Sequence, residues 1–189
     1  MTCIAVVTDR TKTVIGGDAA GVAGLTLTIR NDKKVFMKKD LSGTEWLFGF
    51  TTSFRMGELI QFSLTLPEVG YKAKENLYAF MVTEFVPQVR KCLKDNGWAQ
   101  KEKEQEIGGT FVVALLGHIF VIEGDYQAAE PFDPYFAIGC GSELAKGSLY
   151  TSHLWEGKSL KERIEVALNA AQHGSAGVRE PFTILESSK

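Results

Sequence analysis

The fold is decided by the stretch MTCIAVVTDRTKTVIGGD, residues 1–18. Residues 3–8 and 13–17 are rich in β-branched and small apolar side chains, and the segment between them is polar. Two such runs joined by a short polar segment predict an antiparallel β-hairpin. We therefore expect the first part of the chain to form antiparallel sheet.

Further strands and helices follow in separate blocks. Short β-rich runs continue the sheet at residues 25–29, 34–37 and 46–50. Apolar residues at three- and four-residue steps then predict helices over 54–62, closed by Pro67, and over 77–93, kinked at Pro87 and capped at Gly97. Residues 101–106 read as a mixed-charge connection or a solvated helix end. The second half predicts strands at 110–116, 118–123 and 136–138, helices at 142–151 and 160–172, and a strand at 181–185.

The order of these elements favours one fold class. Strands, two helices, strands, two helices and a final strand follow one another without an internal linker, repeat or low-complexity segment. Segregated blocks predict α+β layering rather than alternating βαβ units. Two antiparallel sheets between helix layers satisfy the order, and other α+β folds also accommodate it. We expect one domain over residues 1–189.

Composition excludes several classes of function. The chain has 189 residues, 44% of them hydrophobic and 23% charged, as in a soluble globular protein with a substantial core. A net charge of -2 disfavours nucleic acid and anionic membrane as partners, because phosphate binding usually needs a concentrated basic surface. No apolar run approaches the ~20 residues of a membrane span, and residues 8–10 interrupt the first run too early for a signal peptide. We expect a cytoplasmic protein.

The sequence predicts no metal and no organic cofactor. Cys3, Cys92 and Cys140 lack metal-ligand spacing, and their odd number argues against a disulfide framework. Each of the three by itself reads as a small buried apolar residue. The three histidines are not spaced with one another or with carboxylates as a metal site requires. The glycine-rich residues 16–21 lack the lysine and hydroxyl of a phosphate-binding loop.

Thr2 is a candidate nucleophile, provided that Met1 is removed. An amino-terminal threonine carries its hydroxyl and its α-amine in one residue, so the amine can serve as the adjacent base. The reference pKa of an α-amine is roughly 8, so a neighbouring cation holds the amine in its unprotonated, basic form near neutral pH. A peptide bond to Met1 abolishes this function.

The sequence resembles the proteasome β subunits and the bacterial HslV peptidase, which are N-terminal-nucleophile hydrolases. The first half matches where Thr2 opens a strand, residues 14–18 (VIGGD) end the next one and residues 33–35 (KKV) start a later one, at the family's spacing. Residues 137–142 (AIGCGS) before a helix and residues 167–171 (ALNAA) within another match the second half. The resemblance implies a four-layer αββα sandwich of two antiparallel sheets between helix layers.

The resemblance also implies a role for each matching position. Thr2 would attack the scissile carbonyl, Lys34 would lie beside its hydroxyl and lower the pKa of the attacking system, and Asp18 would orient Lys34 and pair with it. Such a partner is physically needed, because a buried lysine without one tends to lose its charge. A backbone N–H group in the turn of residues 49–53 would form the oxyanion hole.

Three positions depart from the family's pattern. Thr52 stands where a glycine usually supplies the oxyanion N–H group, so donation requires the threonine to adopt a conformation suited to glycine. Cys140 replaces the serine of a Gly-Ser-Gly element, and a thiol gives the amino terminus a weaker hydrogen bond. Residues 172–177 keep Ser175 but lack the aspartate of proteasome subunits, which favours an HslV-type chain.

The leading hypothesis is a threonine peptidase that forms an acyl-enzyme ester on Thr2 and hydrolyses it with water. The resemblance implies a polypeptide substrate, a homo-oligomeric ring and an ATPase partner that unfolds substrates, within an intracellular degradation particle. One alternative is a catalytically silent ring subunit, which Thr52, Cys140 and the absent aspartate favour. The other is an amidase that acts on small molecules, since shared geometry does not determine substrate class.

Overall fold

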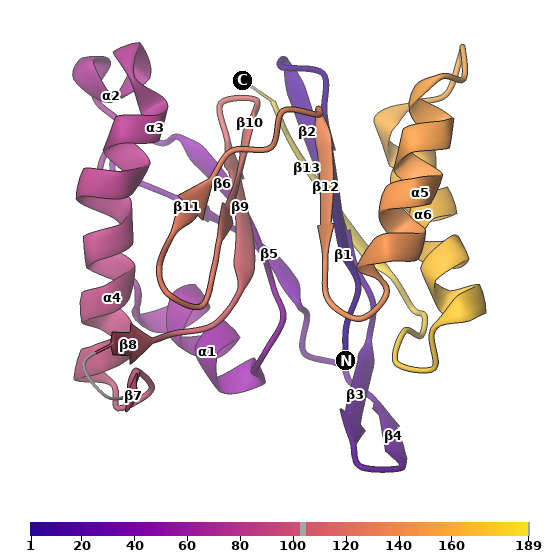
Figure 1. Cartoon of the computed structure of the whole chain (residues 1–189). Helices are drawn as coiled ribbons and strands as arrows, with labels where there is room; N and C mark the ends of the chain where they lie inside the picture. Colours follow the sequence, from indigo (N-terminus) through magenta and orange to yellow (C-terminus); the bar gives the residue numbers. More distant parts are fainter. Residues whose placement is uncertain (103–104, 189) are drawn as a thin grey trace.

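The computed structural model of the chain describes residues 1–102 and 105–188. Two antiparallel sheets stack face to face, and helices cover the outer face of each (Figure 1). The first sheet contains, in order, β12 (Tyr135–Ile138), β1 (Ile4–Thr8), β2 (Lys12–Gly17) and β13 (Thr183–Ser188). The second contains β11 (Ala128–Ala129), β10 (His118–Ile122), β9 (Phe111–Leu115), β6 (Glu45–Phe50) and β5 (Val35–Lys39). The expected α+β sandwich with two antiparallel sheets is confirmed.

The helices form the two outer layers. α5 (Ser142–His153) and α6 (Leu160–Gly174) cover the first sheet (Figure 1). The second sheet is covered by α1 (Phe54–Glu58), the π-helical segment η1 (Leu59–Ser63), α2 (Tyr71–Glu75), α3 (Leu77–Phe80), the π-helical segment η2 (Met81–Phe85) and α4 (Val86–Asp95). None of the helices in the described ranges is long and apolar enough to cross a membrane.

Two short strand pairs lie outside the main sheets. They are β3 (Ala20–Ala23) with β4 (Thr26–Ile29), and β7 (Gln100–Glu102) with β8 (Gln105–Ile107). The β3 and β4 pair projects from the end of the first sheet that carries the amino terminus (Figure 1).

Three apolar clusters fill the spaces between the four layers. The cluster under α1 to α4 is aromatic, with the rings of Trp46 and Phe85 5.1 Å apart. Ile15 and Leu47 belong to the cluster between the two sheets, and Ile164 belongs to the cluster under α5 and α6. β1 is buried along its whole length. Its apolar residues alternate between two clusters, with Ile4 and Val6 between the sheets and Ala5 and Val7 toward the helices.

Several elements differ from those predicted. The helix expected over 77–93 is present as the continuous helical run of α3, η2 and α4, but its middle part is π-helical and Pro87 directly follows that part. Of the connection or helix end expected at 101–106, residues 103–104 lie outside the described part, and the flanking residues pair as β7 and β8. β3, β11 and α2 were not predicted, because they are short and poor in β-branched or periodic apolar residues.

A buried carboxylate holds the turn between β5 and β6. Oδ1 of Asp40 accepts hydrogen bonds from the backbone N–H groups of Ser42 at 2.9 Å and Thr44 at 3.0 Å, and from the Ser42 hydroxyl at 2.6 Å. Oδ2 accepts from Nε1 of Trp46 at 3.3 Å and from the backbone N–H group of Val69 at 3.1 Å. Asp40 therefore ties the turn to the segment that precedes α2.

β2 has no side chain at two successive positions, and both of its faces are closely packed there. A Cβ atom on Gly16 would lie 2.5 Å from Cγ2 of Ile164 in α6. A Cβ atom on Gly17 would lie 2.8 Å from Cδ1 of Ile4 and 3.0 Å from Cγ1 of Val35 in the second sheet. The glycines therefore let α6 and the second sheet approach β2 from opposite sides.

The antiparallel registers bring distant segments together at one end of the sheets. Ile4 pairs with Gly17 on one side and with Ile138 on the other, so the residues before β1 lie beside those after β2 and β12. In the second sheet Val35 pairs with Gly49, which sets the start of β5 beside the end of β6. This end of the sandwich gathers all of the site residues expected from the sequence.

Candidate active site

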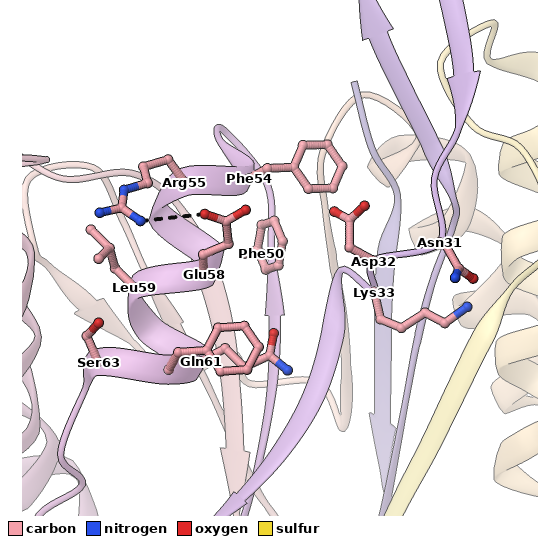
Figure 2. A pocket seen from close by; sticks show the side chains of 11 residues that line it. Asn31, Asp32, Lys33, Phe50, Phe54, Arg55, Glu58, Leu59, Gln61 and Ser63 are labelled. Carbon is pink, nitrogen blue, oxygen red and sulfur yellow. Dashed lines mark ion pairs between the residues drawn. The ribbon is translucent and has the colours of Figure 1, made fainter.

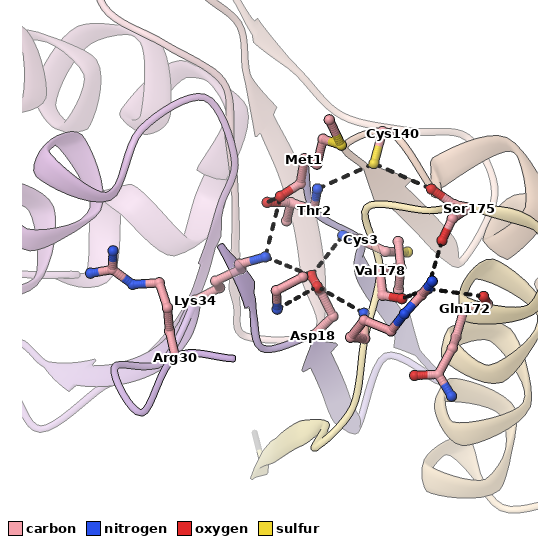
Figure 3. A network of polar contacts seen from close by, with 12 residues as sticks. Met1, Thr2, Cys3, Asp18, Arg30, Lys34, Cys140, Gln172, Ser175 and Val178 are labelled. Atoms are coloured by element: carbon pink, nitrogen blue, oxygen red, sulfur yellow. Dashed lines mark hydrogen bonds and ion pairs between the residues drawn. The ribbon is translucent and has the colours of Figure 1, made fainter. Parts of the chain in front are cut away.

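Thr2, Asp18 and Lys34 lie together around the peptide bond between Met1 and Thr2 (Figure 3). Thr2 precedes β1, Asp18 follows β2 and Lys34 precedes β5. All three residues are buried. The arrangement joins three chain segments that are separated in sequence.

Asp18 is the acceptor at the centre of this cluster. Its Oδ1 accepts hydrogen bonds from Nζ of Lys34 at 2.8 Å and from the backbone N–H group of Cys3 at 2.9 Å. Its Oδ2 accepts from the backbone N–H groups of Ala20 at 2.9 Å and Arg179 at 3.3 Å. Four donors around one buried carboxylate stabilise its charge, as a buried charge requires.

The ammonium group of Lys34 lies inside the protein. Burial lowers the pKa of Lys34 below its ordinary value of 10.5, and the charge and hydrogen bond of Asp18 partly offset that effect. The ring of Phe54 lies 5.8 Å from Nζ, and Nζ also donates to the carbonyl oxygen of Met1 at 3.3 Å. Asp18 is therefore the group that favours the charged form of Lys34 against the effect of burial.

The Met1 carbonyl lies between the Thr2 hydroxyl and the Lys34 ammonium, which are expected to lie side by side. It accepts hydrogen bonds from the hydroxyl of Thr2 and from Nζ of Lys34. The backbone N–H group of Thr2 donates to Sγ of Cys140 at 3.3 Å. The Met1 side chain packs on Gly177, where a Cβ atom would lie 2.7 Å from Sδ. With Met1 attached, the nitrogen of Thr2 is an amide and cannot act as a base.

Cys140 reaches Thr2 because of the turn after β12. Gly139 has a φ of +95°, and a Cβ atom there would overlap the Thr2 carbonyl, so only glycine fits. The turn leaves Sγ of Cys140 beside the backbone nitrogen of Thr2 and 3.4 Å from Oγ of Ser175 (Figure 3). Cys140 is exposed, so its interpretation as a small buried apolar residue is wrong.

The other two thiols lie in apolar surroundings. Cys3 is fully buried. Burial raises the pKa of its thiol to about 12, and the charge of Asp18 contributes a smaller part of that increase. Cys92 is partly buried, with Sγ 3.7 Å from the carbonyl oxygen of Leu59 in the helix layer. Cys140 is therefore the thiol that contacts Thr2.

Thr52 adopts a backbone conformation that favours glycine. Its φ is +67°, in the left-handed region, which costs a β-branched residue about 1–2 kcal/mol. Its Oγ1 accepts a hydrogen bond from the backbone N–H group of Thr110 at 3.1 Å. Within the part of the chain that is described, the Thr52 N–H group has no hydrogen-bond acceptor. Thr52 lines a cavity of about 100 Å³ together with Met1 and Thr2.

A larger cavity of about 390 Å³ adjoins this small one (Figure 2). Phe50 and Phe54 belong to the walls of both cavities. Arg55 and Glu58 pair at 3.6 Å on one side of the larger cavity, and Asp32 and Lys33 lie on the other side (Figure 2).

Some residues of the site could not be found by sequence reasoning. Arg179 donates to Asp18 from 161 residues away, and nothing in its sequence context indicates that contact. Gln172 lies in the segment that lacks the expected aspartate, and its Oε1 accepts from the backbone N–H group of Glu180 at 2.6 Å.

In the described ranges, no group of three or more His, Cys, Asp or Glu side chains could hold a metal ion.

No protein-family model and no curated protein sequence matches the chain. Solved structures do match it. BPH from Thiobacillus denitrificans superposes with a TM-score of 0.74 at 14% identity, covering 98% of this chain and 97% of that one. The same protein in complex with Epoxomicin superposes with a TM-score of 0.72 at 14% identity, covering 98% of each chain.

Two further matches extend the similarity. The eukaryotic HslV from Trypanosoma brucei has a TM-score of 0.66 at 17% identity, covering 99% of each chain. The Anbu complex from Pseudomonas aeruginosa, which forms a helical assembly, has a TM-score of 0.68 at 15% identity, covering 100% of this chain and 81% of that one. These are proteasome-type N-terminal-nucleophile folds, and the chain has this fold.

Proposed function

We propose that the chain is a threonine-type N-terminal-nucleophile peptidase, which hydrolyses peptide bonds with Thr2 once Met1 has been removed. One observation carries the proposal. The buried ion pair of Lys34 and Asp18 lies against the Met1–Thr2 peptide bond, with Nζ of Lys34 3.3 Å from the Met1 carbonyl oxygen. A buried ammonium with a lowered pKa is expected at a functional site, because burial of such a group costs stability.

Removal of Met1 turns the Thr2 nitrogen into an amine and frees the Thr2 hydroxyl from its present acceptor. The hydroxyl proton passes to the amine as Oγ1 bonds to the scissile carbonyl carbon. The amine then returns the proton to the leaving nitrogen as the C–N bond breaks, which leaves an ester on Oγ1. Water attacks the ester with the same amine as base, and the hydroxyl is restored. The charge of Lys34 favours the unprotonated amine throughout.

The Thr52 backbone N–H group is the proposed oxyanion donor. Thr52 lines the same small cavity as Thr2, and its N–H group has no acceptor within the described residues. A donor held ready before the reaction needs no reorganisation when negative charge develops on the carbonyl oxygen. The strained φ of +67° supports this role, since backbone strain is concentrated at functional sites.

Cys140 and Ser175 are the proposed supports of the freed amine. Sγ of Cys140 already accepts from the Thr2 nitrogen at 3.3 Å, and Oγ of Ser175 lies 3.4 Å from that sulfur. Both atoms can accept hydrogen bonds from the protonated amine. They hold its position while it carries the proton.

The substrate we propose is a polypeptide, with one side chain in the cavity between Phe50 and Phe54. The chain would act as a single domain over residues 1–189 in a cytoplasmic homo-oligomer, supplied by an ATPase that unfolds substrates. The helical assembly of the Anbu complex supports the oligomer. Size-exclusion chromatography with light scattering tests it, and a monomer would favour the small-molecule amidase.

Intact-mass analysis of the purified protein is the first test of the peptidase. We expect a chain that begins at Thr2 and gains the mass of one epoxomicin, a peptide with an electrophilic epoxyketone. Thr2→Ala should abolish both the adduct and peptide hydrolysis, whereas Thr2→Ser keeps a hydroxyl and should retain part of the rate. Unchanged hydrolysis by Thr2→Ala would exclude the proposed nucleophile.

The second candidate function is a silent ring subunit. One observation favours it: the atom beside the Thr2 nitrogen is the thiol sulfur of Cys140, which is a weaker hydrogen-bond partner than a hydroxyl oxygen. A purified protein that keeps Met1 and forms no epoxomicin adduct, yet assembles, would establish that alternative.

A further inference from the structure

The segment between α6 and β13 passes alongside Asp18. The backbone N–H group of Arg179 donates to Oδ2 of Asp18 at 3.3 Å, and the Arg179 carbonyl accepts from the N–H group of Ala19 at 2.8 Å. These two bonds join the segment to the end of β2 on the carboxylate side of the site.

The side chain of the same residue turns back to the end of α6. Nη1 of Arg179 donates to the carbonyl oxygens of Val178 at 2.6 Å, Ser175 at 3.0 Å and Gln172 at 3.5 Å. The last carbonyls of a helix have no partner within it, and they form the negative end of the helix dipole. A guanidinium group presents several donors in a rigid fork and keeps its charge, so it suits this position.

Ser175 connects this contact to the amine side of the site. Its carbonyl is held by Arg179 at 3.0 Å, and its hydroxyl lies 3.4 Å from Sγ of Cys140. That sulfur accepts from the Thr2 nitrogen at 3.3 Å (Figure 3). Arg179 thus contacts Asp18 directly through its backbone N–H group. It is connected to Thr2 indirectly, through Ser175 and then Cys140.

We infer that Arg179 is a positioning residue, which holds the amine supports of Thr2 in register with the ion pair of Asp18 and Lys34. The inference rests on the proposed function. Arg179 touches neither the substrate nor a reacting atom, so it acts through the location of Ser175 and Cys140. Misplacement of a supporting group by about 1 Å can cost on the order of 100-fold in rate.

The test uses the full-length chain and the variants Arg179→Ala and Arg179→Lys. The matched control is Arg90→Ala, because Arg90 is an exposed arginine on α4 that pairs with Glu106 at 2.6 Å in the other helix layer. For Arg179→Ala we expect kcat for peptide hydrolysis to fall on the order of 10- to 100-fold with KM little changed. Arg179→Lys should lie between Arg179→Ala and the wild type, because lysine offers a single point of donation.

Two readouts separate positioning from simple stabilisation of the helix end. Millimolar guanidinium ion should restore part of the kcat of Arg179→Ala and leave Arg90→Ala unchanged. Iodoacetamide labelling, mapped by peptide mass, should modify Cys140 several-fold faster in Arg179→Ala, because Oγ of Ser175 is no longer held 3.4 Å from the sulfur. Cys3 serves as the internal reference, since it is fully buried.

The outcomes are distinguishable. If Arg179→Ala keeps the wild-type kcat and the wild-type labelling rate of Cys140, the inference is overturned. A loss of kcat that follows the melting temperature and is not restored by guanidinium also overturns it. If the wild type itself hydrolyses no peptide and binds no epoxomicin, the proposed function fails, and the labelling rates still decide whether Arg179 positions Cys140.

Discussion

Nζ of Lys34 and Oδ1 of Asp18 are 2.8 Å apart, with only 1% and 0% of the two side chains exposed to solvent. The two partners are held unequally. Asp18 also accepts three backbone N–H groups, whereas the other acceptor of Lys34 is the Met1 carbonyl, which is lost when Met1 is removed. The ammonium therefore depends on the carboxylate more than the carboxylate depends on the ammonium.

This inequality predicts the order of two stability losses. Asp18→Asn leaves a buried ammonium without its counter-charge and should lower the free energy of unfolding by about 3–5 kcal/mol. Lys34→Met should cost less, because three N–H donors still stabilise the carboxylate. Urea unfolding at neutral pH measures both, and the double substitution should recover part of the Asp18→Asn loss. A greater loss for Lys34→Met would contradict the argument.

Asp40 predicts a dependence of stability on pH. Burial alone would raise the pKa of Asp40, but the hydrogen bonds from its turn, from Trp46 and from Val69 outweigh burial and hold that pKa below its ordinary value of 3.8. The folded pKa lies below the unfolded one. The contribution of Asp40 is therefore complete above the unfolded pKa and is lost as the pH falls through the folded pKa.

Asp40→Asn should lower the free energy of unfolding by about 1–3 kcal/mol at neutral pH, because buried donors lose their charged acceptor. The difference from the wild type should shrink as the pH falls below 3.8, the ordinary pKa of this group. Urea unfolding of both proteins across this pH range provides the measurement. The other carboxyl groups are present in both proteins, so their effects cancel in the difference between the two free energies of unfolding. A difference that does not vary with pH would show that Asp40 adds nothing through its charge.

Cys140 predicts opposite effects for two small substitutions. Cys140→Ser supplies a hydroxyl, which is a stronger hydrogen-bond partner than a thiol, and should keep or raise kcat/KM. Cys140→Ala removes the acceptor of the Thr2 nitrogen and should lower kcat/KM by roughly tenfold. Peptide hydrolysis by both variants, with Cys92→Ser as the control, decides the matter. Equal rates for Ser and Ala would mean that the residue does not support the amine.

Gly177 predicts a substitution that discriminates between the two forms of the amino terminus. A Cβ atom there would lie 2.7 Å from Sδ of Met1, so Gly177→Ala should destabilise the Met1-bearing chain by about 1–3 kcal/mol. Once Met1 is absent, the contact disappears and the substitution should be nearly neutral. Thermal unfolding compares the two forms, prepared from fusions whose cleavage leaves either Met1 or Thr2 first. The same loss in both forms would refute this packing.

Thr52 predicts that the backbone, rather than the side chain, is needed for hydrolysis. Thr52→Gly removes the strain at φ +67° and keeps the N–H group, so peptide hydrolysis should be retained. Thr52→Val keeps the branched shape but removes the acceptor of the Thr110 N–H group, and should lower the free energy of unfolding by about 1 kcal/mol. Loss of hydrolysis in Thr52→Gly, to the level of Thr2→Ala, would mean that the side chain is required.

The sequence predicted the hairpin of β1 and β2 because strand periodicity and turn composition are local properties. The site positions Thr2, Asp18 and Lys34 came from the resemblance to the proteasome β subunits and HslV, and the antiparallel pairing of the strands explains why the chain segments that carry them meet. The exposure of Cys140 was not predictable in this way. It depends on the turn at Gly139 and on the end of α6, which are far apart in the sequence.

The contact between Arg179 and Asp18 shows where local reasoning ends. The two residues are separated by 161 positions, and the hydrogen bond uses a backbone N–H group that every non-proline residue carries. No side-chain pattern marks such a bond. The π-helical segments η1 and η2 were missed for a related reason, because their apolar spacing is close to that of an ordinary helix.

The paired glycines of β2 have a consequence that extends beyond packing. Gly16 lets α6 approach one face of β2, and Gly17 lets Val35 of the second sheet approach the other face, directly beside Lys34. A methyl group added at Gly17 would wedge Val35 outward and carry the start of β5 with it. The ammonium would be drawn away from its carboxylate although neither residue had been changed. The position of the Lys34 ammonium is therefore set by the packing of the layers as well as by its ion pair with Asp18.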